Sequence, residues 1–328
     1  MCRPLGQLEQ RNLRDVSWIM RDSPVMRECF HFDFVAMGSP CSLDLYAHDF
    51  KTANEIAALA VAEVHRIELK YSRYRSENYL AEINKSARSG GCTFVDAETS
   101  DLIDHAFCAF VISEGLFDVT CGVLREIWND DISAPPQESD IALLLRRVGF
   151  EKIIWTRPQL TFTVAGMELD FGGIAKEYAA DRAVTICRAL GVSSGMVNFG
   201  GDIAIIGKPP DDAPWRIGIA DPFGSGTALA TLFVTGGGVA TSGTYERYRE
   251  LNGRRYSHVV NPKTGWPVEG LPSVTVISQN CLVAGVYSTL ALLMGENAPS
   301  WLCECGVEHA CVAVGRTLCG SVFSHTRA

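Results

Sequence analysis

The chain has 328 residues, of which 47% are hydrophobic and 20% are charged, a globular balance that excludes a disordered or fibrous chain. Its 29 basic and 38 acidic side chains give a net charge of −9. An acidic surface is unsuited to general nucleic-acid binding, because phosphate neutralisation needs a basic face. The twelve cysteines are scattered without zinc-finger spacing, which predicts buried, reduced thiols.

Residues 1–28 have mixed charge and no sustained period, so we expect a poorly ordered lead-in before a single domain at 29–328. The lead-in lacks the apolar run of an export signal. No stretch of about 18 uncharged apolar residues occurs further along the chain. We therefore expect no membrane span and a cytoplasmic location.

In chain order, the first predicted element is a hairpin, because residues 30–34 and 41–46 alternate and a turn-like Met-Gly-Ser-Pro lies between them. Apolar residues at helical spacing predict the helices of the first half. These are expected at 52–70, 99–113, 139–147 and 174–190, the last ended by Gly191. Short strands between the last two helices are expected at 152–156, 160–164 and 167–171.

The second half is rich in predicted strands and closes with two helices. The strands are expected at 195–199, 202–206, 215–220, 228–235, 256–260 and 272–278, and the helices at 281–294 and 298–305. Strands and helices are mixed without βαβ order, which favours an α+β fold with mixed, largely antiparallel sheets and flanking helices over a doubly wound sheet. We expect one compact unit with two lobes around a cleft.

A strand–turn–helix junction at 169–176, Leu-Asp-Phe-Gly-Gly-Ile-Ala-Lys, is the first candidate for chemistry. Gly172 and Gly173 would let the backbone approach a ligand closely, and a helix N-terminus offers free N–H groups to an anion. Lys176 adds a positive charge. The combination suits a phosphate or pyrophosphate, or else it is a plain junction with a surface lysine.

Three further segments could serve a ligand, and each also has a structural explanation. Asn-Phe-Gly-Gly-Asp at 198–202 indicates either a turn close to a ligand or a tight hairpin. Three glycines followed by Val-Ala-Thr-Ser-Gly at 236–243 could surround phosphate oxygens or form a flexible loop. His258 precedes the Asn-Pro-Lys-Thr-Gly turn of 261–265, and such a histidine is either catalytic or paired with a carbonyl.

Taken together and in this order, the segments resemble motifs of the ApbE family of FAD:protein FMN transferases, from residue 37 to about residue 295. Any one block is weak evidence, whereas seven in the right order are specific. The blocks are Met-Gly-Ser at 37–39, Ser-Arg-Tyr at 72–74, Phe-Asp-Val-Thr-Cys-Gly-Val-Leu at 117–124, Asp-Phe-Gly-Gly-Ile-Ala-Lys at 170–176, and the segments 198–202, 240–243 and 257–265.

The resemblance implies an ApbE-like, two-lobed α+β fold around an FAD cleft. It also implies transfer of FMN from FAD to a threonine or serine hydroxyl of an acceptor protein, with release of AMP and with Mg²⁺ at the pyrophosphate. His258 would be the catalytic proton acceptor near the transferred group. The implied FAD-binding residues are Met37, Ser72, Tyr74, Asp118, Gly172, Gly173, Lys176, Asp181, Gly200, Gly201, Ser242, Gly243 and Thr264.

The implied metal ligands are Ala175 and Thr289, with Glu177 as a further candidate. The family's last helix carries Ala-Asp-x-x-x-Thr, but residues 284–289 read Ala-Gly-Val-Tyr-Ser-Thr, so Gly285 stands at the carboxylate position. Glu177 stands where the family has glycine, and Asn261 where it usually has aspartate. Either the Glu177 carboxylate has moved to the metal site from the other wall, or it points to solvent in the first turn of its helix, where the dipole favours it.

These departures leave two alternative functions beside flavin transfer. One is an FAD-binding protein that has lost metal-dependent transfer. The other is an FAD pyrophosphatase that gives FMN and AMP with water as the acceptor. The predicted partners are FAD and an acceptor protein whose target threonine or serine lies in a sequence of the type Asp-x-x-[Ser/Ala]-[Thr/Ser]-Gly.

Overall fold

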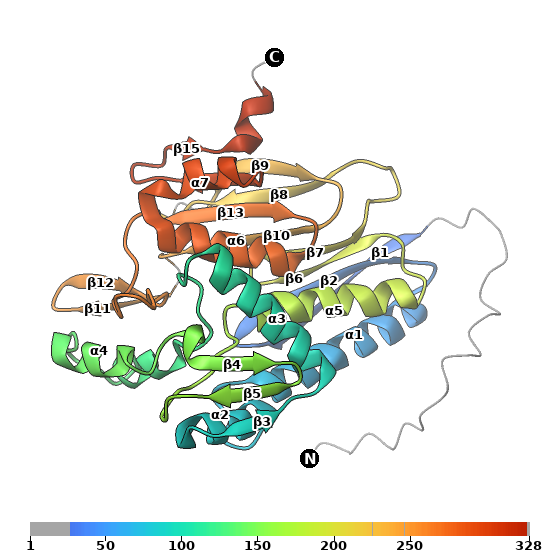
Figure 1. The fold of residues 1–328 in the computed structure, drawn as a ribbon. Helices are drawn as coiled ribbons and strands as arrows, with labels where there is room; N and C mark the ends of the chain where they lie inside the picture. The colour runs from blue at the N-terminus through green and yellow to red at the C-terminus, as the bar shows by residue number, and fades with distance from the viewer. Residues whose placement is uncertain (1–26, 225, 246, 327–328) are drawn as a thin grey trace.

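The computed structural model describes residues 27–224, 226–245 and 247–326, and these form an α+β fold built on an eight-stranded sheet (Figure 1). Every neighbouring pair of strands in this sheet is antiparallel. In spatial order the strands are β1 (Glu28–Ala36), β2 (Ser39–Ala47), β6 (Gly195–Phe199), β7 (Asp202–Gly207), β10 (Gly238–Gly243), β13 (Ser273–Ser278), β14 (Glu308–Val312) and β15 (Leu318–Cys319).

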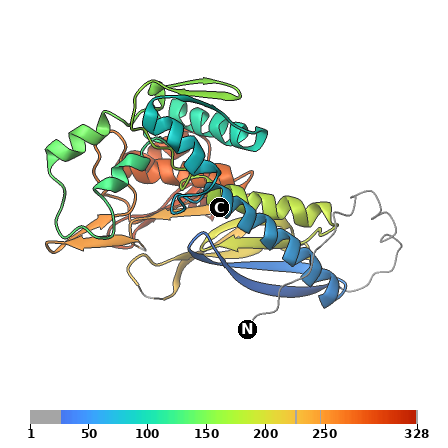
Figure 2. The same cartoon turned by 90° about the horizontal axis from the view of Figure 1, so that it is seen from below.

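Three long helices cover one face of this sheet: α1 (Phe50–Tyr71), α5 (Ala175–Ala189) and α6 (Cys281–Met294). Figure 2 shows α1 and α5 side by side across the sheet. The α5 helix packs on β7, and α6 packs on β10 and β13. The first turn of α5 and the middle of α6 are therefore held next to each other.

The opposite face is covered by the hairpin of β8 (Trp215–Ala220) and β9 (Ala228–Val234). Strand β7 is thus buried on both faces, with Ile203 and Ile205 in the cluster under the hairpin and Ala204 and Ile206 in the cluster under the helices. This explains why β7 is a continuous apolar run rather than an alternating one.

A second group of elements lies below the main sheet in Figure 1 and faces it across the ends of α1 and α5. It holds a three-stranded sheet in the order β3 (Cys92–Phe94), β5 (Gln159–Phe162) and β4 (Ile153–Thr156). The other elements of the described chain are not all part of this group, since α7, η3 and η4 contact α6 or β14 of the main sheet region. They are α2 (Tyr79–Ser89), α3 (Ala97–Ile112), α4 (Glu138–Leu145), α7 (Ala298–Glu304), β11 (Tyr248–Leu251), β12 (Arg254–Ser257), and the short 3₁₀ helices η1 (Gly122–Glu126), η2 (Phe150–Lys152), η3 (Gly295–Asn297) and η4 (Ser321–Thr326).

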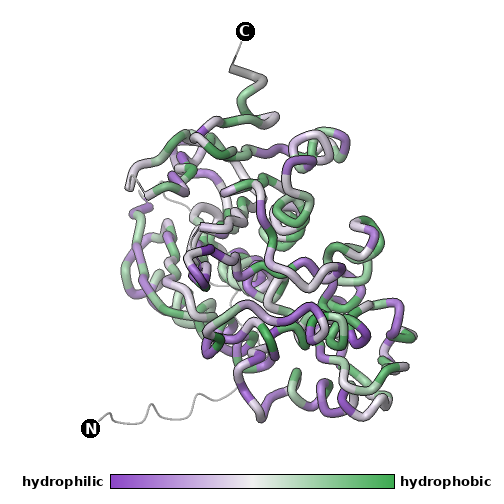
Figure 3. The backbone as a smooth tube through the Cα atoms, turned by 90° about the vertical axis from the view of Figure 1, so that its left-hand side faces the viewer, coloured by the Kyte–Doolittle hydropathy of each residue, from purple (hydrophilic) through white to green (hydrophobic). Residues whose placement is uncertain are grey.

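Most periodic elements expected from the sequence are confirmed, and the α+β class with them. Figure 3 shows apolar and polar stretches alternating along the described chain, as expected where many short elements each bury one face. Three expectations were wrong or incomplete. Residues 167–171 form no strand and contribute one bridge, between Cys121 and Glu168. Helix α2 was missed. Glu28 already belongs to β1, while residues 1–26 lie outside the described residues.

The glycine-rich segment 236–243 is largely a strand and not the flexible loop that was the structural alternative. A contact of this segment with phosphate oxygens stays a prediction. The segment forms β10 near the middle of the main sheet, paired along its whole length with β13. A Cβ on Gly238 would lie 2.2 Å from the backbone nitrogen of Cys281, so the glycine is needed for the N-terminus of α6 to pack here. The sequence suggested that this glycine provides backbone freedom, whereas in the structure it is needed for close packing.

The thiol and membrane expectations need adjustment as well. All eleven described cysteines are free, but Cys29, Cys92, Cys108, Cys303 and Cys305 are exposed rather than buried. The stretch Cys281–Glu304 is long and apolar enough to span a bilayer by composition, yet half of its most apolar window is buried inside the protein. Since the stretch comprises α6, η3 and α7, and α6 packs on β10 and β13, it is better explained as core helices.

The Gly238 contact predicts a large difference between two neighbouring alanine substitutions. Gly238→Ala should destabilise the protein by about 3 kcal/mol or more, because the new methyl group meets backbone that cannot move aside. Gly236→Ala is the matched control, since its Cβ would meet nothing within 4 Å, and it should stay within about 1 kcal/mol of the parent. Thermal unfolding measures both, and equal midpoints for the two variants would contradict the assignment.

Candidate functional site

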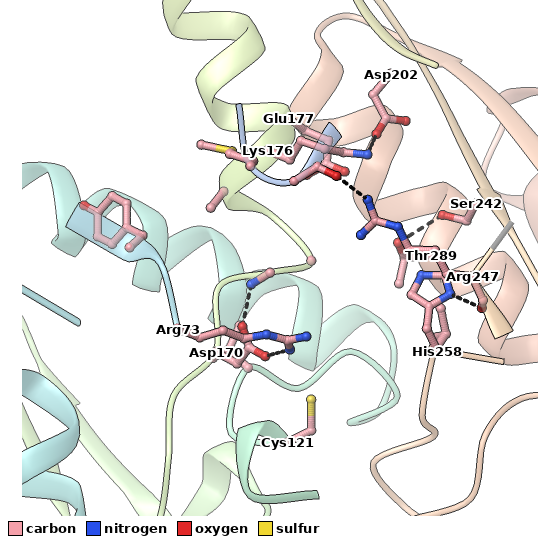
Figure 4. A pocket seen from close by; sticks show the side chains of 18 of the residues that line it. Arg73, Cys121, Asp170, Lys176, Glu177, Asp202, Ser242, Arg247, His258 and Thr289 are labelled. Carbon is pink, nitrogen blue, oxygen red and sulfur yellow. Dashed lines mark hydrogen bonds and ion pairs between the residues drawn. The ribbon is translucent and has the colours of Figure 1, made fainter. Parts of the chain in front are cut away.

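A pocket of about 630 Å³ opens between the main sheet and the second group of elements. This lies within the range of roughly 300–1,000 Å³ typical of small-molecule and cofactor sites. Its walls come from the β1–β2 turn, the segments after α1 and α3, the first turn of α5, the β6–β7 turn, the end of β10, the segment around His258, and α6. Segments far apart in sequence therefore meet at one cavity (Figure 4).

The structure brings most sequence-predicted site residues to this cavity and leaves three outside it. Their roles as ligands of a bound molecule remain predictions. The residues at the cavity are Met37, Ser72, Tyr74, Asp118, Gly172, Gly173, Ala175, Lys176, Glu177, Gly200, Ser242, Gly243, His258 and Thr289, and those outside it are Asp181, Gly201 and Thr264.

Asp181 lies outside the cavity lining and has a structural task, while its expected contact with FAD stays a prediction. Its two carboxylate oxygens accept hydrogen bonds from the backbone N–H groups of Cys281 and Leu282, both at 2.9 Å. It therefore caps the N-terminus of α6 and fixes that helix to α5. Burial raises the pKa of Asp181, and the two amide donors partly offset this effect.

Gly201 and Thr264 stabilise turns beyond the cavity. The Gly201 amide, at a φ of 101°, donates to the side-chain oxygen of Asn198 at 2.9 Å. The Thr264 hydroxyl oxygen accepts from the Trp266 amide at 3.3 Å. The glycine and hydroxyl were visible in the sequence, but their direction relative to the cavity was not.

Asp118 lines the cavity, although its carboxylate is engaged by the protein itself. Oδ1 accepts from the amide and hydroxyl of Thr120 at 2.8 and 2.7 Å, and Oδ2 accepts from the Phe150 amide at 3.1 Å. Burial raises its pKa, and these donors oppose the rise. The contacts indicate that Asp118 shapes this wall.

The junction between residue 170 and α5 forms the floor of the cavity. Asp170 Oδ1 accepts from the Gly172 amide at 2.8 Å, and Oδ2 pairs with the Arg73 guanidinium. A Cβ on Gly173 would lie 3.4 Å from the Phe117 ring. Ile174, which precedes α5, supplies no side-chain cap to the first turn of the helix.

Lys176 and Asp202 form an ion pair at the back of the cavity, as Figure 4 shows. Burial alone would lower the pKa of Lys176, but the Asp202 carboxylate and then Glu177 outweigh it and raise the pKa. Asp202 also accepts from the Thr241 amide at 3.0 Å. The ammonium therefore stays charged, and β7 and β10 hold its counter-ion in place.

Glu177 lies beside this pair with one oxygen left over. The residue is only 8% exposed, and its Oε2 has no hydrogen-bond partner. Burial raises the pKa of Glu177 to about 8, with Asp202 adding to the rise and Lys176 opposing it. The expectation that Glu177 points to solvent is thereby excluded, because its side chain lies inward against Gly285 of α6.

His258 lies at the mouth of the cavity, accessible to solvent yet surrounded by several segments. Its Nδ1 lies 2.9 Å from the carbonyl oxygen of Arg247, which only accepts hydrogen bonds, so Nδ1 carries the proton and Nε2 is free to accept one. Burial lowers the pKa of His258, the Arg247 carbonyl opposes the fall, and the cations Arg247, Lys176 and Arg73 add to it.

Three hydroxyl groups lie close together where β10 meets α6. Ser242 Oγ of β10 lies 2.9 Å from Ser288 Oγ and 3.2 Å from Thr289 Oγ1, both on α6. Sequence reasoning missed Arg247, which donates to the Ser39 hydroxyl at 3.0 Å and lines the cavity beside His258. The sequence offered no signal for it, because its position depends on how the loop before β11 folds back.

The chain is similar to known proteins over most of its length. A sequence model described as the ApbE family matches residues 37–312. An FAD:protein FMN transferase of Klebsiella pneumoniae is 33% identical over 291 residues, which is 87% of this chain and 85% of the relative. The ApbE protein of Thermotoga maritima superposes with a TM-score of 0.84 at 28% identity, covering 91% of this chain and 99% of that one. The apo flavinyl transferase ApbE of Pseudomonas stutzeri gives 0.81 at 28% identity, covering 93% and 98%.

Burial at His258 and a carboxylate partner at His31 shift the pKa values of these two histidines in opposite directions. His258 should titrate below 6.5 and be protonated on Nδ1 when neutral, whereas His31, whose pKa is raised first by its hydrogen bond to Asp44, should titrate above 6.5. Nitrogen-15 NMR across a pH series reports both the pKa and the tautomer. A His258 pKa at or above that of His31, or a neutral form protonated on Nε2, would contradict the derived geometry.

Proposed function

The chain belongs to the ApbE family, and on this premise we propose that it transfers FMN from FAD to a serine or threonine hydroxyl of an acceptor protein and releases AMP. The observation that carries the proposal is the cavity itself, which His258, with its Nε2 free, lines together with Lys176 and the first turn of α5. Phosphoryl transfer depends mainly on positioning and on charge neutralisation, and these groups supply both.

The roles follow from the geometry of each group. The hydroxyl oxygen of the acceptor attacks the phosphorus of the FMN half, the bond from that phosphorus to the bridging oxygen breaks, and AMP leaves. His258 Nε2 accepts the proton of the attacking hydroxyl, because Nδ1 is already committed to the Arg247 carbonyl. Lys176 neutralises phosphate charge from the back of the cavity, where Asp202 fixes its position.

The charge of the cavity supports a cation as well. Its described lining includes five acidic side chains and three basic ones. A pyrophosphate would enter such a site at an electrostatic cost unless further positive charge accompanied it. The acidic residues are Glu68, Asp118, Asp170, Glu177 and Asp202, and the basic ones are Arg73, Lys176 and Arg247.

The donor atoms fit Mg²⁺, which prefers hard oxygen ligands. No group of three or more His, Cys, Asp and Glu side chains that could hold a metal occurs in the described part of the chain. The fit rests instead on the partnerless buried oxygen of Glu177, with Thr289 and Ala175 at the same cavity. These residues would hold Mg²⁺, which would neutralise the pyrophosphate charge that develops during transfer.

The direct test is incubation of the protein with FAD, Mg²⁺ and a small acceptor domain that carries a target of the type given above. We expect covalent flavin on the acceptor and AMP in equal amount. AMP formed at the same rate without any acceptor would instead indicate a pyrophosphatase. Tight FAD binding with neither product would indicate a binding protein that has lost transfer.

His258→Gln should lower the rate of flavin transfer by about 10²- to 10⁴-fold, the usual contribution of a general base. The affinity for FAD should change only a few-fold, because the proton transfer concerns the acceptor hydroxyl. His31→Gln is the control and should transfer at the parental rate, since His31 lies on β1 away from the cavity. Transfer by His258→Gln at the parental rate would refute the assigned role.

A further inference from the structure

One position on α6 and one on α5 share the same small space. A Cβ built on Gly285 would lie 2.5 Å from Glu177 Cγ, 3.0 Å from its Cδ and 3.2 Å from its Oε1. A distance of 2.5 Å does not occur between non-bonded carbon atoms, so no side chain at 285 can coexist with Glu177 as it is placed. The absence of a side chain at Gly285 thus leaves the space that the Glu177 side chain occupies.

The carboxylate in this space is aimed at the cavity. Glu177 lines the cavity and is almost fully buried, and its Oε2 has no hydrogen-bond partner. A buried carboxylate oxygen without a partner costs free energy, so the arrangement is best explained by a ligand that the oxygen is placed to contact. Lys176 does not meet this need, because its ammonium pairs with Asp202.

Neighbouring oxygens make the ligand a cation. Thr289 lies one helical turn after Gly285 and therefore on the same face of α6, and it lines the same cavity. Its hydroxyl lies 3.2 Å from that of Ser242. Figure 4 shows Glu177, Thr289 and Ser242 bordering one pocket. A carboxylate beside hydroxyl oxygens is a donor set for a hard divalent ion.

We propose that Glu177 supplies, from α5, the carboxylate ligand for a divalent cation in this cleft, in place of a side chain at position 285 of α6. The inference rests on the proposed function, because that function gives the cation its use. It goes further by treating Glu177 and Gly285 as one reciprocal pair, in which the missing side chain at 285 makes room for the ligand. A hard cation responds to the number and charge of its oxygens, and not to the helix that supplies them.

The pair predicts the behaviour of three variants. Glu177→Gln keeps the shape of the side chain and should weaken Mn²⁺ binding at least about tenfold, since one anionic ligand is lost. Gly285→Asp alone should lower the unfolding midpoint, because its Cβ meets the Glu177 side chain. The double variant Glu177→Gly with Gly285→Asp removes that clash and should recover Mn²⁺ affinity to within a few-fold of the parent.

The experiment measures Mn²⁺ binding to the full chain by electron paramagnetic resonance, with and without FAD, alongside thermal unfolding with Mg²⁺. Glu82→Gln is the control, because Glu82 lies on α2 outside the cavity lining and pairs with Lys85, and it should bind Mn²⁺ like the parent. Equal Mn²⁺ affinity for Glu177→Gln and the parent would overturn the inference.

Failure of the inference can be told apart from failure of the proposed function. If Glu177→Gln binds Mn²⁺ and transfers FMN like the parent, the transferase stands and Glu177 is not a ligand. If the parent binds FAD but no Mn²⁺, the cation assignment falls, and the transfer assay then shows whether flavin transfer survives without it.

Discussion

The buried contact between α5, β7 and α6 is the constraint on which the cleft depends. Three ionisable side chains meet there, Lys176, Glu177 and Asp202, and a buried charge is tolerated only when it is compensated. The positive charge of Lys176 compensates the Asp202 carboxylate, so the Glu177 carboxylate is left without a paired cation. A proton or a bound cation has to balance it, and the proposed transfer of FMN from FAD gives the cation a use.

Further contacts hold α5, β7 and α6 in this arrangement. Asp181 ties the N-terminus of α6 to α5 through two backbone amides, and Gly238 lets the same end of α6 approach β10. On the other side of the cavity, Arg247 donates from its guanidinium to Ser39 and accepts from His258 through its carbonyl. The position of the histidine is thereby coupled to the β1–β2 turn, so both walls are fixed by hydrogen bonds between segments distant in sequence.

The sequence predicts elements whose pattern is local and fails where the cause is tertiary. The hairpin, α1, α5 and α6 are visible because apolar residues recur at the period of each element. Strand β10 is hidden because Gly238 serves a contact with Cys281, which no local pattern reveals. Helix α2 has buried Leu80, Ile83 and Ala87 at helical spacing, but over eleven residues this is a weak signal.

The residues of the candidate site likewise include some that local motifs predict and some whose role depends on tertiary contacts. Ordered motifs bring most of the expected residues to one cavity, yet motif matching does not tell a ligand contact from a helix cap, as Asp181 shows. Nor does it place Arg247, or show that Glu177 and Gly285 lie against each other.

The most direct test of the central claim is a crystal structure with FAD and Mn²⁺, measured at a wavelength where manganese scatters anomalously. The account predicts a peak about 2.1–2.2 Å from a Glu177 carboxylate oxygen and next to the pyrophosphate. A manganese peak at the pyrophosphate with Glu177 turned away from it would contradict the account.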